Sequence, residues 1–472
     1  MSNFKIEQIY TGCIAHAAYY IENNGEAAIF DPLREVQPYI DRAVSDNAKV
    51  KYVFLTHFHA DFVSGHLDLS KKTGAEIVYG PTAKPAYEIT NARDGQIFEL
   101  GGYKIKAIHT PGHTMESTSF LLIDETGKEH GIITGDALFI GDVGRPDLAQ
   151  HVIEDLTEDK LARYLYHSLR EKIMPLSDHL IVYPNHGAGS ACGKMMSKET
   201  TDTLGNQKKT NYALQDMTED EFVKSLLTGL TTPPSYFPQN VLMNINGYES
   251  LDTVLDNAKK PLSPSEFEAV ATESRALVLD TRDAGDFAKK FIPNSINIGL
   301  DGSFAMWVGE MIPDIKQEIL LVTDEGKEEE SMVRLSRIGF DHTIGYLKGG
   351  IDAWTTANFE TNSVERITTK DLEGVNLEET KIFDVRKKSE YNSEHLVGAI
   401  NVPLNEINKH LVGFPKEEKF IIHCAGGYRS MIAASILKQR GWDNFTDVKE
   451  GFDGIKVSSL EVTEYVCPTT LL

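Results

Sequence analysis

One short segment of this sequence concentrates side chains that bind metals: Leu55-Thr56-His57-Phe58-His59-Ala60-Asp61-Phe62-Val63-Ser64-Gly65-His66. It begins where the apolar run Tyr52-Val53-Phe54 ends, so we place its polar side chains at the end of a strand. Single residues separate His57, His59 and Asp61, and one loop can turn all three toward the same point. Imidazole and carboxylate groups suit Zn, Fe, Mn, Ni or Cu. The segment therefore predicts a metal site at a sheet edge; the alternative is a histidine-rich turn that only caps backbone groups.

Three further segments repeat this arrangement of an apolar strand that ends near a histidine or an aspartate. The first leads into Thr110-Pro111-Gly112-His113, where proline and glycine mark a turn. The second is the short β-branched strand Gly131-Ile132-Ile133-Thr134-Gly135, which stops at Asp136. The third is Leu180-Ile181-Val182-Tyr183-Pro184-Asn185-His186. Four strands that end in this way indicate a site built on one edge of a sheet.

This ordered set resembles the metallo-β-lactamase superfamily over about residues 5–245. The resemblance implies an αββα sandwich whose metal site lies at one edge of two packed sheets. Hydrolases of the superfamily carry His-x-His-x-Asp-His, in which the last aspartate and histidine hold a second metal ion. Phe62 stands at the final position here, and a phenyl ring has no lone pair to donate. The departure favours a site for a single metal ion.

With Phe62, the segments Thr56–Phe62, Thr110–Thr114 and Thr134–Ala137 look like the persulfide dioxygenase branch of that superfamily, whose members bind one Fe(II). Two imidazoles and one carboxylate leave positions open on iron for O2 and a substrate sulfur. The resemblance implies that the metal ligands are His57, His113 and Asp136. It also implies that these ligands are surrounded and supported by His59, Asp61 and His186. The sequence leaves open whether His59 is a ligand and whether the metal is zinc.

Two residues near this edge have alternative interpretations. Arg145 lies in Gly144-Arg145-Pro146-Asp147, which resembles a Gly-Arg-x-Asp segment of persulfide dioxygenases. The resemblance implies that Arg145 helps to hold the thiol substrate, because a guanidinium matches a carboxylate at two points; the alternative is an ion pair with Asp142 or Asp147. Cys192 is either a buried small hydrophobe or a supporting thiol that faces the iron pocket and could carry a persulfide.

Length and composition set the frame for these motifs. A chain of 472 residues allows about three domains as a prior. No apolar run approaches the ~18 residues of a membrane helix, the first residues lack a signal-peptide pattern, and four scattered cysteines make no disulfide framework. A net charge of −23 disfavours nucleic acid and anionic membranes as partners. We therefore expect a cytoplasmic protein with neither of these partners.

From residue 263 onward the sequence contains a duplication. Leu279-Asp280-Thr281-Arg282 recurs as Phe383-Asp384-Val385-Arg386, and Ile296-Asn297-Ile298 recurs as Ile400-Asn401-Val402, both at an offset of 104. Each copy alternates strands and helices, which predicts an α/β domain with a parallel sheet. We therefore predict three domains, at residues 1–250, 262–360 and 364–472.

The second copy holds a cysteine loop, Cys424-Ala425-Gly426-Gly427-Tyr428-Arg429, between an apolar strand and a helix. Loop N–H groups and a helix N-terminus there would stabilise a thiolate or a persulfide anion. With Asp384-Val385-Arg386, the loop resembles the rhodanese family of sulfurtransferases over about residues 365–460. The resemblance implies that Cys424 carries the sulfane sulfur and that Arg429 binds substrate.

Loop length and residue type separate this copy from its alternatives. Related phosphatases also place an arginine after the cysteine, but with five intervening residues, whereas four lie between Cys424 and Arg429. The first copy has Thr323-Asp324-Glu325-Gly326 at the matching position, and no cysteine occurs between Cys192 and Cys424. We predict that the first copy is an inactive rhodanese-like domain and that the second is active.

As a whole, the sequence resembles bacterial fusions of a persulfide dioxygenase with rhodanese domains. The resemblance implies one Fe(II) per chain and a substrate that is the persulfide of glutathione, coenzyme A or a similar thiol. O2 would oxidise it to sulfite, and sulfur transfer would give thiosulfate. We expect a homo-oligomer. Two alternatives remain: a binuclear zinc thioester hydrolase of the glyoxalase II kind fused to a sulfurtransferase, and a sulfur-sensing or carrier protein with a structural metal.

Overall fold

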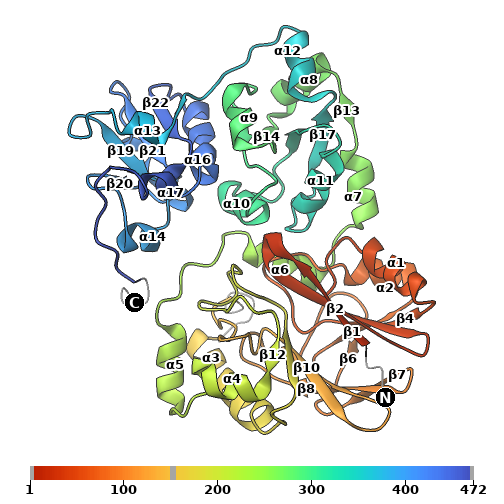
Figure 1. The fold of residues 1–472 in the computed structure, drawn as a ribbon. Helices are drawn as coiled ribbons and strands as arrows, with labels where there is room; N and C mark the ends of the chain where they lie inside the picture. Colours follow the sequence, from red (N-terminus) through yellow and green to blue (C-terminus); the bar gives the residue numbers. More distant parts are fainter. Residues whose placement is uncertain (1–4, 149–155, 468–472) are drawn as a thin grey trace. The chain divides into compact units, whose positions relative to one another are not determined.

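The computed structural model describes residues 5–148 and 156–467 of the chain. The chain folds into two compact units. The first contains Met1–Val254 and Leu335–Gly339, and the second contains Leu255–Arg334 and Phe340–Leu472. Figure 1 draws the chain up to Val254 from red to green, and the chain from Leu255 onward, which includes Leu335–Gly339 of the first unit, from green to blue.

Two six-stranded sheets form the first unit. One sheet has the order β1-β2-β3-β4-β5-β6 and the other β12-β11-β10-β9-β8-β7. The strands of the first sheet are β1 (Lys5–Thr11), β2 (His16–Asn23), β3 (Glu26–Phe30), β4 (Lys49–Phe54), β5 (Glu76–Tyr79) and β6 (Thr90–Asn91). Those of the second are β7 (Ile97–Leu100), β8 (Tyr103–His109), β9 (Thr118–Ile123), β10 (Glu129–Gly135), β11 (Ile181–Pro184) and β12 (Asp202–Thr203).

Apolar side chains from both sheets meet in one buried cluster between them. Phe120 of β9 packs against Phe30 of β3 and Phe54 of β4, with ring centroids 5.4 and 4.9 Å away. Each such aromatic pair is worth ~0.5–1.5 kcal/mol beyond the area that it buries. The alternation of apolar side chains along these strands therefore accounts for the face-to-face packing of the sheets.

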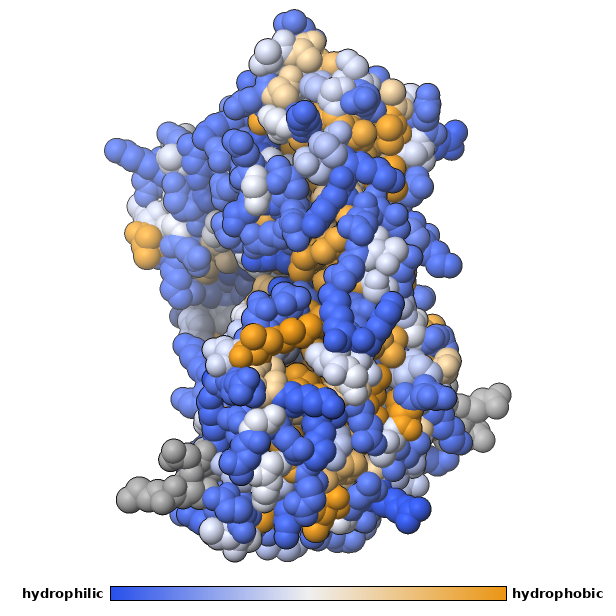
Figure 2. All heavy atoms as spheres, turned by 90° about the vertical axis from the view of Figure 1, so that its right-hand side faces the viewer, coloured by the Kyte–Doolittle hydropathy of each residue, from blue (hydrophilic) through white to orange (hydrophobic). Residues whose placement is uncertain are grey.

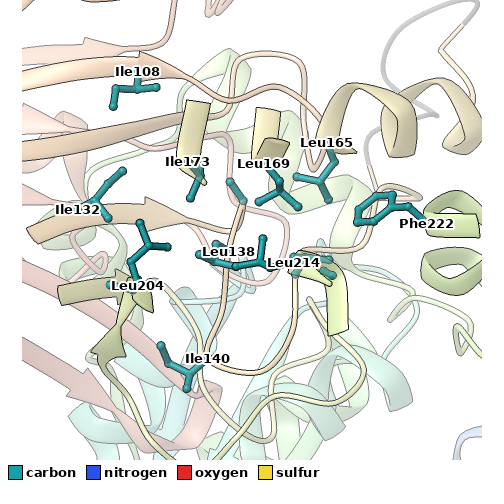
Figure 3. Packing of buried hydrophobic residues seen from close by; sticks show 14 of the residues in the cluster. Ile108, Ile132, Leu138, Ile140, Leu165, Leu169, Ile173, Leu204, Leu214 and Phe222 are labelled. Carbon is teal, nitrogen blue, oxygen red and sulfur yellow. The ribbon is translucent and has the colours of Figure 1, made fainter. Parts of the chain in front are cut away.

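Helices cover the outer faces of both sheets. The helices of this unit are α1 (Gln37–Ser45), α2 (His66–Thr73), α3 (Glu158–His167), α4 (Leu204–Thr210), α5 (Glu219–Leu227) and α6 (Phe237–Asn246), and α7 (Leu251–Ala258) begins in this unit and ends in the second. Helices α1 and α2 pack on the first sheet beside β4. On the second sheet, Ile108 and Ile132 face Leu165 of α3 and Phe222 of α5 (Figure 3). The predicted αββα architecture is confirmed.

Local sequence signals explain where individual helices begin. At α5, the Thr218 side chain accepts from the Glu221 N–H, and the Glu221 carboxylate accepts from the Thr218 N–H. This reciprocal cap satisfies two N–H groups that the first turn of a helix leaves unpaired. Residues 71–90 contain the end of α2, strand β5 and an irregular segment that leads to β6. Pro81 and Pro85 disfavour a regular helix in this segment.

The second unit contains two five-stranded sheets with the same topology, β13-β17-β16-β14-β15 and β18-β22-β21-β19-β20. Every neighbouring pair is parallel. The strands are β13 (Pro261–Leu262), β14 (Leu277–Asp280), β15 (Ile296–Asn297), β16 (Ile319–Val322), β17 (Thr343–Leu347), β18 (Arg366–Ile367), β19 (Lys381–Asp384), β20 (Ile400–Asn401), β21 (Phe420–His423) and β22 (Phe445–Val448).

Its helices follow the same pattern. They are α8 (Pro264–Ser274), α9 (Ala284–Lys289), α10 (Phe304–Met311), α11 (Glu328–Ser336), α12 (Gly350–Thr356), α13 (Thr369–Leu372), α14 (Lys388–Ser393), α15 (Ile407–His410), α16 (Tyr428–Gln439) and α17 (Gly451–Ile455). The predicted pair of α/β domains with parallel sheets is confirmed. Their predicted borders stay predictions, as does the border at residue 250.

The duplication extends to individual hydrogen bonds. Arg282 donates to the Asp280 carboxylate from Nε and Nη2, and Arg386 donates to Asp384 in the same way. In each copy an asparagine amide, Asn297 or Asn401, also donates to the backbone carbonyls of that aspartate and that arginine. Each pair is buried, so the recurring Asp-x-Arg sequence secures the carboxyl ends of β14 and β19.

Figure 2 shows a face on which hydrophilic residues predominate, with hydrophobic residues between them. Within residues 5–148 and 156–467, no helix has both the length and the apolar character that a bilayer crossing requires.

Candidate metal centre and sulfurtransferase loop

The three predicted metal ligands meet at one edge of the sandwich. His57 follows β4 of the first sheet, whereas His113 and Asp136 follow β8 and β10 of the second. All three are buried, and one ligand atom of each lies within 4.8 Å of the others. Asp136 Oδ2 is 3.4 Å from His113 Nε2 and 3.8 Å from His57 Nε2. The carboxyl ends of strands from two sheets thus converge on one point.

The surroundings of these side chains fit a metal ion. His57 Nε2 is buried and has no hydrogen-bond partner among the described residues. The opposite ring nitrogens are held from outside: Thr56 Oγ1 is 2.9 Å from His57 Nδ1, and the Arg145 carbonyl is 2.7 Å from His113 Nδ1. Burial, and then the neighbouring imidazoles, hold the pKa of His57 well below its usual value. A neutral imidazole with one nitrogen fixed and the other free is the form that binds metals.

His186 bridges two carboxylates next to this group. Its Nδ1 is 2.9 Å from Asp136 Oδ1 and its Nε2 is 2.9 Å from Asp61 Oδ2. Burial alone would lower the pKa of His186, but the two carboxylates outweigh it and raise the pKa well above the usual value. His186 therefore orients Asp136 and links it to Asp61.

A second group of ligand-type side chains lies in the same region. Asp61, His186 and Cys192 are all buried, with one ligand atom of each within 4.8 Å of the others. Asp61 Oδ1 has no hydrogen-bond partner among the described residues. Burial, then the charges of Asp61 and Asp136, raises the pKa of the Cys192 thiol well above its usual value. Cys192 is thus buried beside the metal centre; whether it carries sulfur stays a prediction.

His59 lies outside both groups. Its Nε2 is 2.9 Å from Asp31 Oδ1, and the same oxygen accepts from the Thr56 N–H at 2.8 Å. The ring of Phe62, which is fully buried, stacks on His59 at 4.3 Å between centroids and contacts His16 at 4.3 Å. An apolar ring therefore stands where hydrolases of the superfamily have a ligand.

Sequence reasoning missed Asp31 and His16. His16 Nε2 is 2.9 Å from the Asp31 backbone carbonyl, so both residues support the same edge of the site. The signal for Asp31 was present, because β3 ends immediately before it, as β10 ends before Asp136. His16 carries no comparable signal, since it begins a strand.

Gly144 lets the next segment approach the site. A Cβ at this position would lie 2.1 Å from the Asp136 carbonyl and 2.8 Å from His113 Nδ1, so no larger residue fits. The neighbouring Arg145 is buried and donates from Nε and Nη2 to the two oxygens of Asp147, each at 2.6 Å. Nη2 also donates to the Thr231 carbonyl. These bonds occupy Nε and Nη2, whereas Nη1 meets only the Ala191 carbonyl among the described residues, at 3.4 Å. The contact of the guanidinium with substrate stays a prediction.

The predicted sulfurtransferase loop follows β21. Cys424 is buried, and its sulfur accepts from the Gly427 N–H at 3.2 Å. Gly427 has a φ of +89°, and a Cβ there would lie 2.5 Å from the Lys449 carbonyl. Arg429 donates to both oxygens of Glu390, at 2.6 and 2.8 Å. Sequence reasoning missed Glu390, because nothing local relates α14 to the loop.

Strand register locates the corresponding position of the first copy. Asp384 pairs with His423 in one sheet, and Asp280 pairs with Val322 in the other. The residue after Val322 is Thr323, so a threonine occupies the position of Cys424. The first copy therefore lacks the thiol that sulfur transfer requires.

Comparisons with known proteins agree with this architecture. A metallo-beta-lactamase superfamily model matches residues 11–186, and a rhodanese-like domain model matches residues 263–357 and 370–458. The crystal structure of a metallo-beta-lactamase from Staphylococcus aureus subsp. aureus COL is similar, with 30% identity and a TM-score of 0.64, over 74% of this chain and 99% of that one.

Two curated relatives cover the first part of the chain. Hydroxyacylglutathione hydrolase GloC of Haemophilus influenzae is 27% identical over 212 residues, which are 40% of this chain and 88% of the relative. Persulfide dioxygenase ETHE1 of Homo sapiens is 30% identical over 163 residues, which are 34% of this chain and 59% of the relative. The two-sheet sandwich with a buried His/Asp centre and the two parallel sheets agree with these matches. The chain therefore belongs to the metallo-beta-lactamase superfamily and carries two rhodanese-like domains after that fold.

Proposed function

We propose that this protein oxidises low-molecular-weight thiol persulfides to sulfite and then combines sulfite with a sulfane sulfur to give thiosulfate. In the first reaction, one persulfide, one O2 and one water give one thiol, one sulfite and two protons. The observation that carries the proposal is the buried group of His57, His113 and Asp136, together with the buried Phe62 ring that stacks on His59. The similarity to a persulfide dioxygenase supports it.

The side chains of the first unit would hold one Fe(II) and orient it. Fe(II) bound by two imidazoles and one carboxylate supplies open positions for O2 and a sulfur ligand. Thr56 Oγ1 and the Arg145 carbonyl fix the two imidazole rings. His186 holds Asp136 from the other side and links it to Asp61. The burial of all these groups excludes bulk water from the reacting sulfur.

The second reaction would take place at Cys424. A persulfide delivers its terminal sulfur to the Cys424 thiolate, and the carrier leaves as a thiol. The sulfur lone pair of sulfite then attacks that sulfane sulfur, the S–S bond to Cys424 breaks, and the thiolate is regenerated as thiosulfate departs. The Gly427 N–H points at the sulfur that carries negative charge in both steps. Arg429 adds a cation to the same loop.

A binuclear hydrolase is the second candidate. The group of Asp61, His186 and Cys192 favours it, because these side chains could hold another ion next to the first. The similarity to a hydroxyacylglutathione hydrolase agrees with that view. Phe62 counts against it, because it removes one ligand of the second ion.

Metal analysis combined with product analysis tests the proposal. Protein purified without oxygen should hold about one Fe(II) per chain, consume O2 when a thiol persulfide is added, and release sulfite and thiosulfate. Two zinc ions per chain with hydrolysis of a thioester would establish the hydrolase instead. Metal retention without oxygen uptake or hydrolysis would favour a sensor or carrier. Gel filtration of the same sample would test the proposed homo-oligomer.

A further inference from the structure

A cavity of about 560 Å³ opens beside the metal centre, with His113 in its wall. Proteins bind small molecules in cavities of ~300–1,000 Å³ that are mostly apolar and contain a few polar groups. Apolar side chains make up much of this wall, among them Phe58, Leu148, Val241 and Ile245. A molecule that fills the cavity would therefore place one end at the predicted metal ligands.

Most polar groups of the wall are already engaged. Glu116 is buried and accepts from the Phe58 N–H at 2.9 Å, and the Thr114 hydroxyl pairs with Ser117 at 2.7 Å. Lys84 differs, because it is exposed and its ammonium has no ion pair or hydrogen bond with any described residue. The cavity thus offers an incoming ligand one free cation and a largely apolar surface.

We propose that this cavity binds the organic part of the persulfide and selects thiols that have an extended apolar body and one anionic group, which Lys84 attracts. The inference rests on the proposed function for the reaction at the sulfur. A glutathione persulfide fits less well, because its two carboxylates and one ammonium would lie against an apolar wall with a single free cation. A buried charge without a partner is costly.

A series of synthetic thiols tests the charge rule. The probes are the persulfides of 6-mercaptohexanoate and 6-aminohexanethiol, which have the same length and opposite charge, with glutathione persulfide as a third. Oxygen uptake by the iron-loaded full chain gives kcat/KM for each. The carboxylate should be preferred, and Lys84→Glu should reverse the preference through KM, with a change of about 5-fold or more in the ratio. Lys104→Glu is the matched control, because Lys104 is an exposed lysine of β8 outside the cavity.

The length of the carbon chain of the thiol tests whether the apolar wall contributes to binding. Replacing 6-mercaptohexanoate by 3-mercaptopropionate removes three methylenes, and each buried methylene should be worth about 4-fold in affinity. Calorimetry with the thiols themselves, on protein with and without iron, measures this binding independently of turnover. The series needs no change to the protein, so it does not depend on the folding of a variant.

The outcomes separate the two proposals. Loss of oxygen uptake with every persulfide would refute the proposed oxidation, while calorimetry would still decide on the cavity. Oxygen uptake without a preference for the carboxylate, a preference for the amine, or an unchanged preference in Lys84→Glu would each overturn the role of Lys84. Equal affinity for the short and the long thiol would overturn the role of the apolar wall.

Discussion

Arg145 and Asp147 form a buried ion pair in which two guanidinium nitrogens meet both carboxylate oxygens at 2.6 Å. The same arginine holds His113 through its backbone carbonyl. Its connection to the metal centre therefore runs through the main chain, and Asp147 occupies the Nε–Nη2 edge of its guanidinium.

This ion pair leads to predictions for two variants, whose KM values for persulfide should change in opposite directions. Arg145→Ala should keep iron but raise the KM for persulfide, with a loss of roughly 10- to 150-fold in kcat/KM if a charge-assisted contact of ~1.5–3 kcal/mol disappears. It should also lower the free energy of unfolding by ~3 kcal/mol or more, because Asp147 loses its partner. Asp147→Asn releases the guanidinium and should lower the KM. Unchanged KM values in both variants would assign Arg145 to structure alone.

The metal ligands are tested by comparing neighbouring histidines. His57→Ala and Asp136→Ala should each lose iron and oxygen uptake together, because each removes a side chain of the ligand group. His59→Ala should retain about one iron per chain, because His59 Nε2 lies on Asp31 and His59 is outside that group. Iron content measured on protein purified without oxygen distinguishes them. Loss of iron in His59→Ala would make His59 a ligand.

Product analysis of two variants tests whether persulfide oxidation and sulfur transfer are coupled. Cys424→Ser should keep oxygen uptake and shift the product from thiosulfate to free sulfite. Asp136→Ala should show no oxygen uptake and still form thiosulfate from added sulfite and persulfide, because the cysteine loop is separate from the ligand group. Chromatography of both anions measures the result. If Cys424→Ser makes thiosulfate at the wild-type rate, Cys192 is the next thiol to examine.

Glu390 is expected to position Arg429 in the cysteine loop. Glu390→Gln removes the charge that receives both guanidinium bonds. Because the pair is partly exposed, we expect a cost of about 1 kcal/mol, or roughly a 5-fold loss in kcat/KM for sulfur transfer. Glu394→Gln is the control, since Glu394 pairs with an exposed lysine, Lys456. Equal losses in both variants would contradict a specific role.

A comparison of two glycines with similar backbone angles distinguishes the effect of backbone strain from that of a steric collision. Gly427 and Gly441 have φ values of +89° and +84°, but a Cβ at Gly441 would meet nothing within 4 Å. Gly441→Ala should therefore cost only the ~1–2 kcal/mol of a left-handed conformation. Gly427→Ala adds a collision with the Lys449 carbonyl and should abolish sulfur transfer while oxygen uptake persists. Sulfur transfer at the wild-type rate in Gly427→Ala would show that the loop tolerates displacement.

Much of the fold was accessible from local patterns. Apolar runs that end at His57, His113, Asp136 and His186 predicted strands whose ends converge. Such strands can be predicted locally, because whether a short segment forms a strand depends mainly on its own residues and on those next to it in the sequence. The repeat of Asp-x-Arg at Asp280 and Asp384 predicted two copies of one domain for the same reason.

Partners that lie far apart in the sequence emerged only from the packed structure. Asp31 supports His59, and Glu390 fixes Arg429. The types of residue and their spacing along the chain indicate which chemical groups are present and which segments form helices or strands. They do not determine the distance between two carboxylates and the imidazole that bridges them, because that distance is set when two sheets pack and bury their polar ends together.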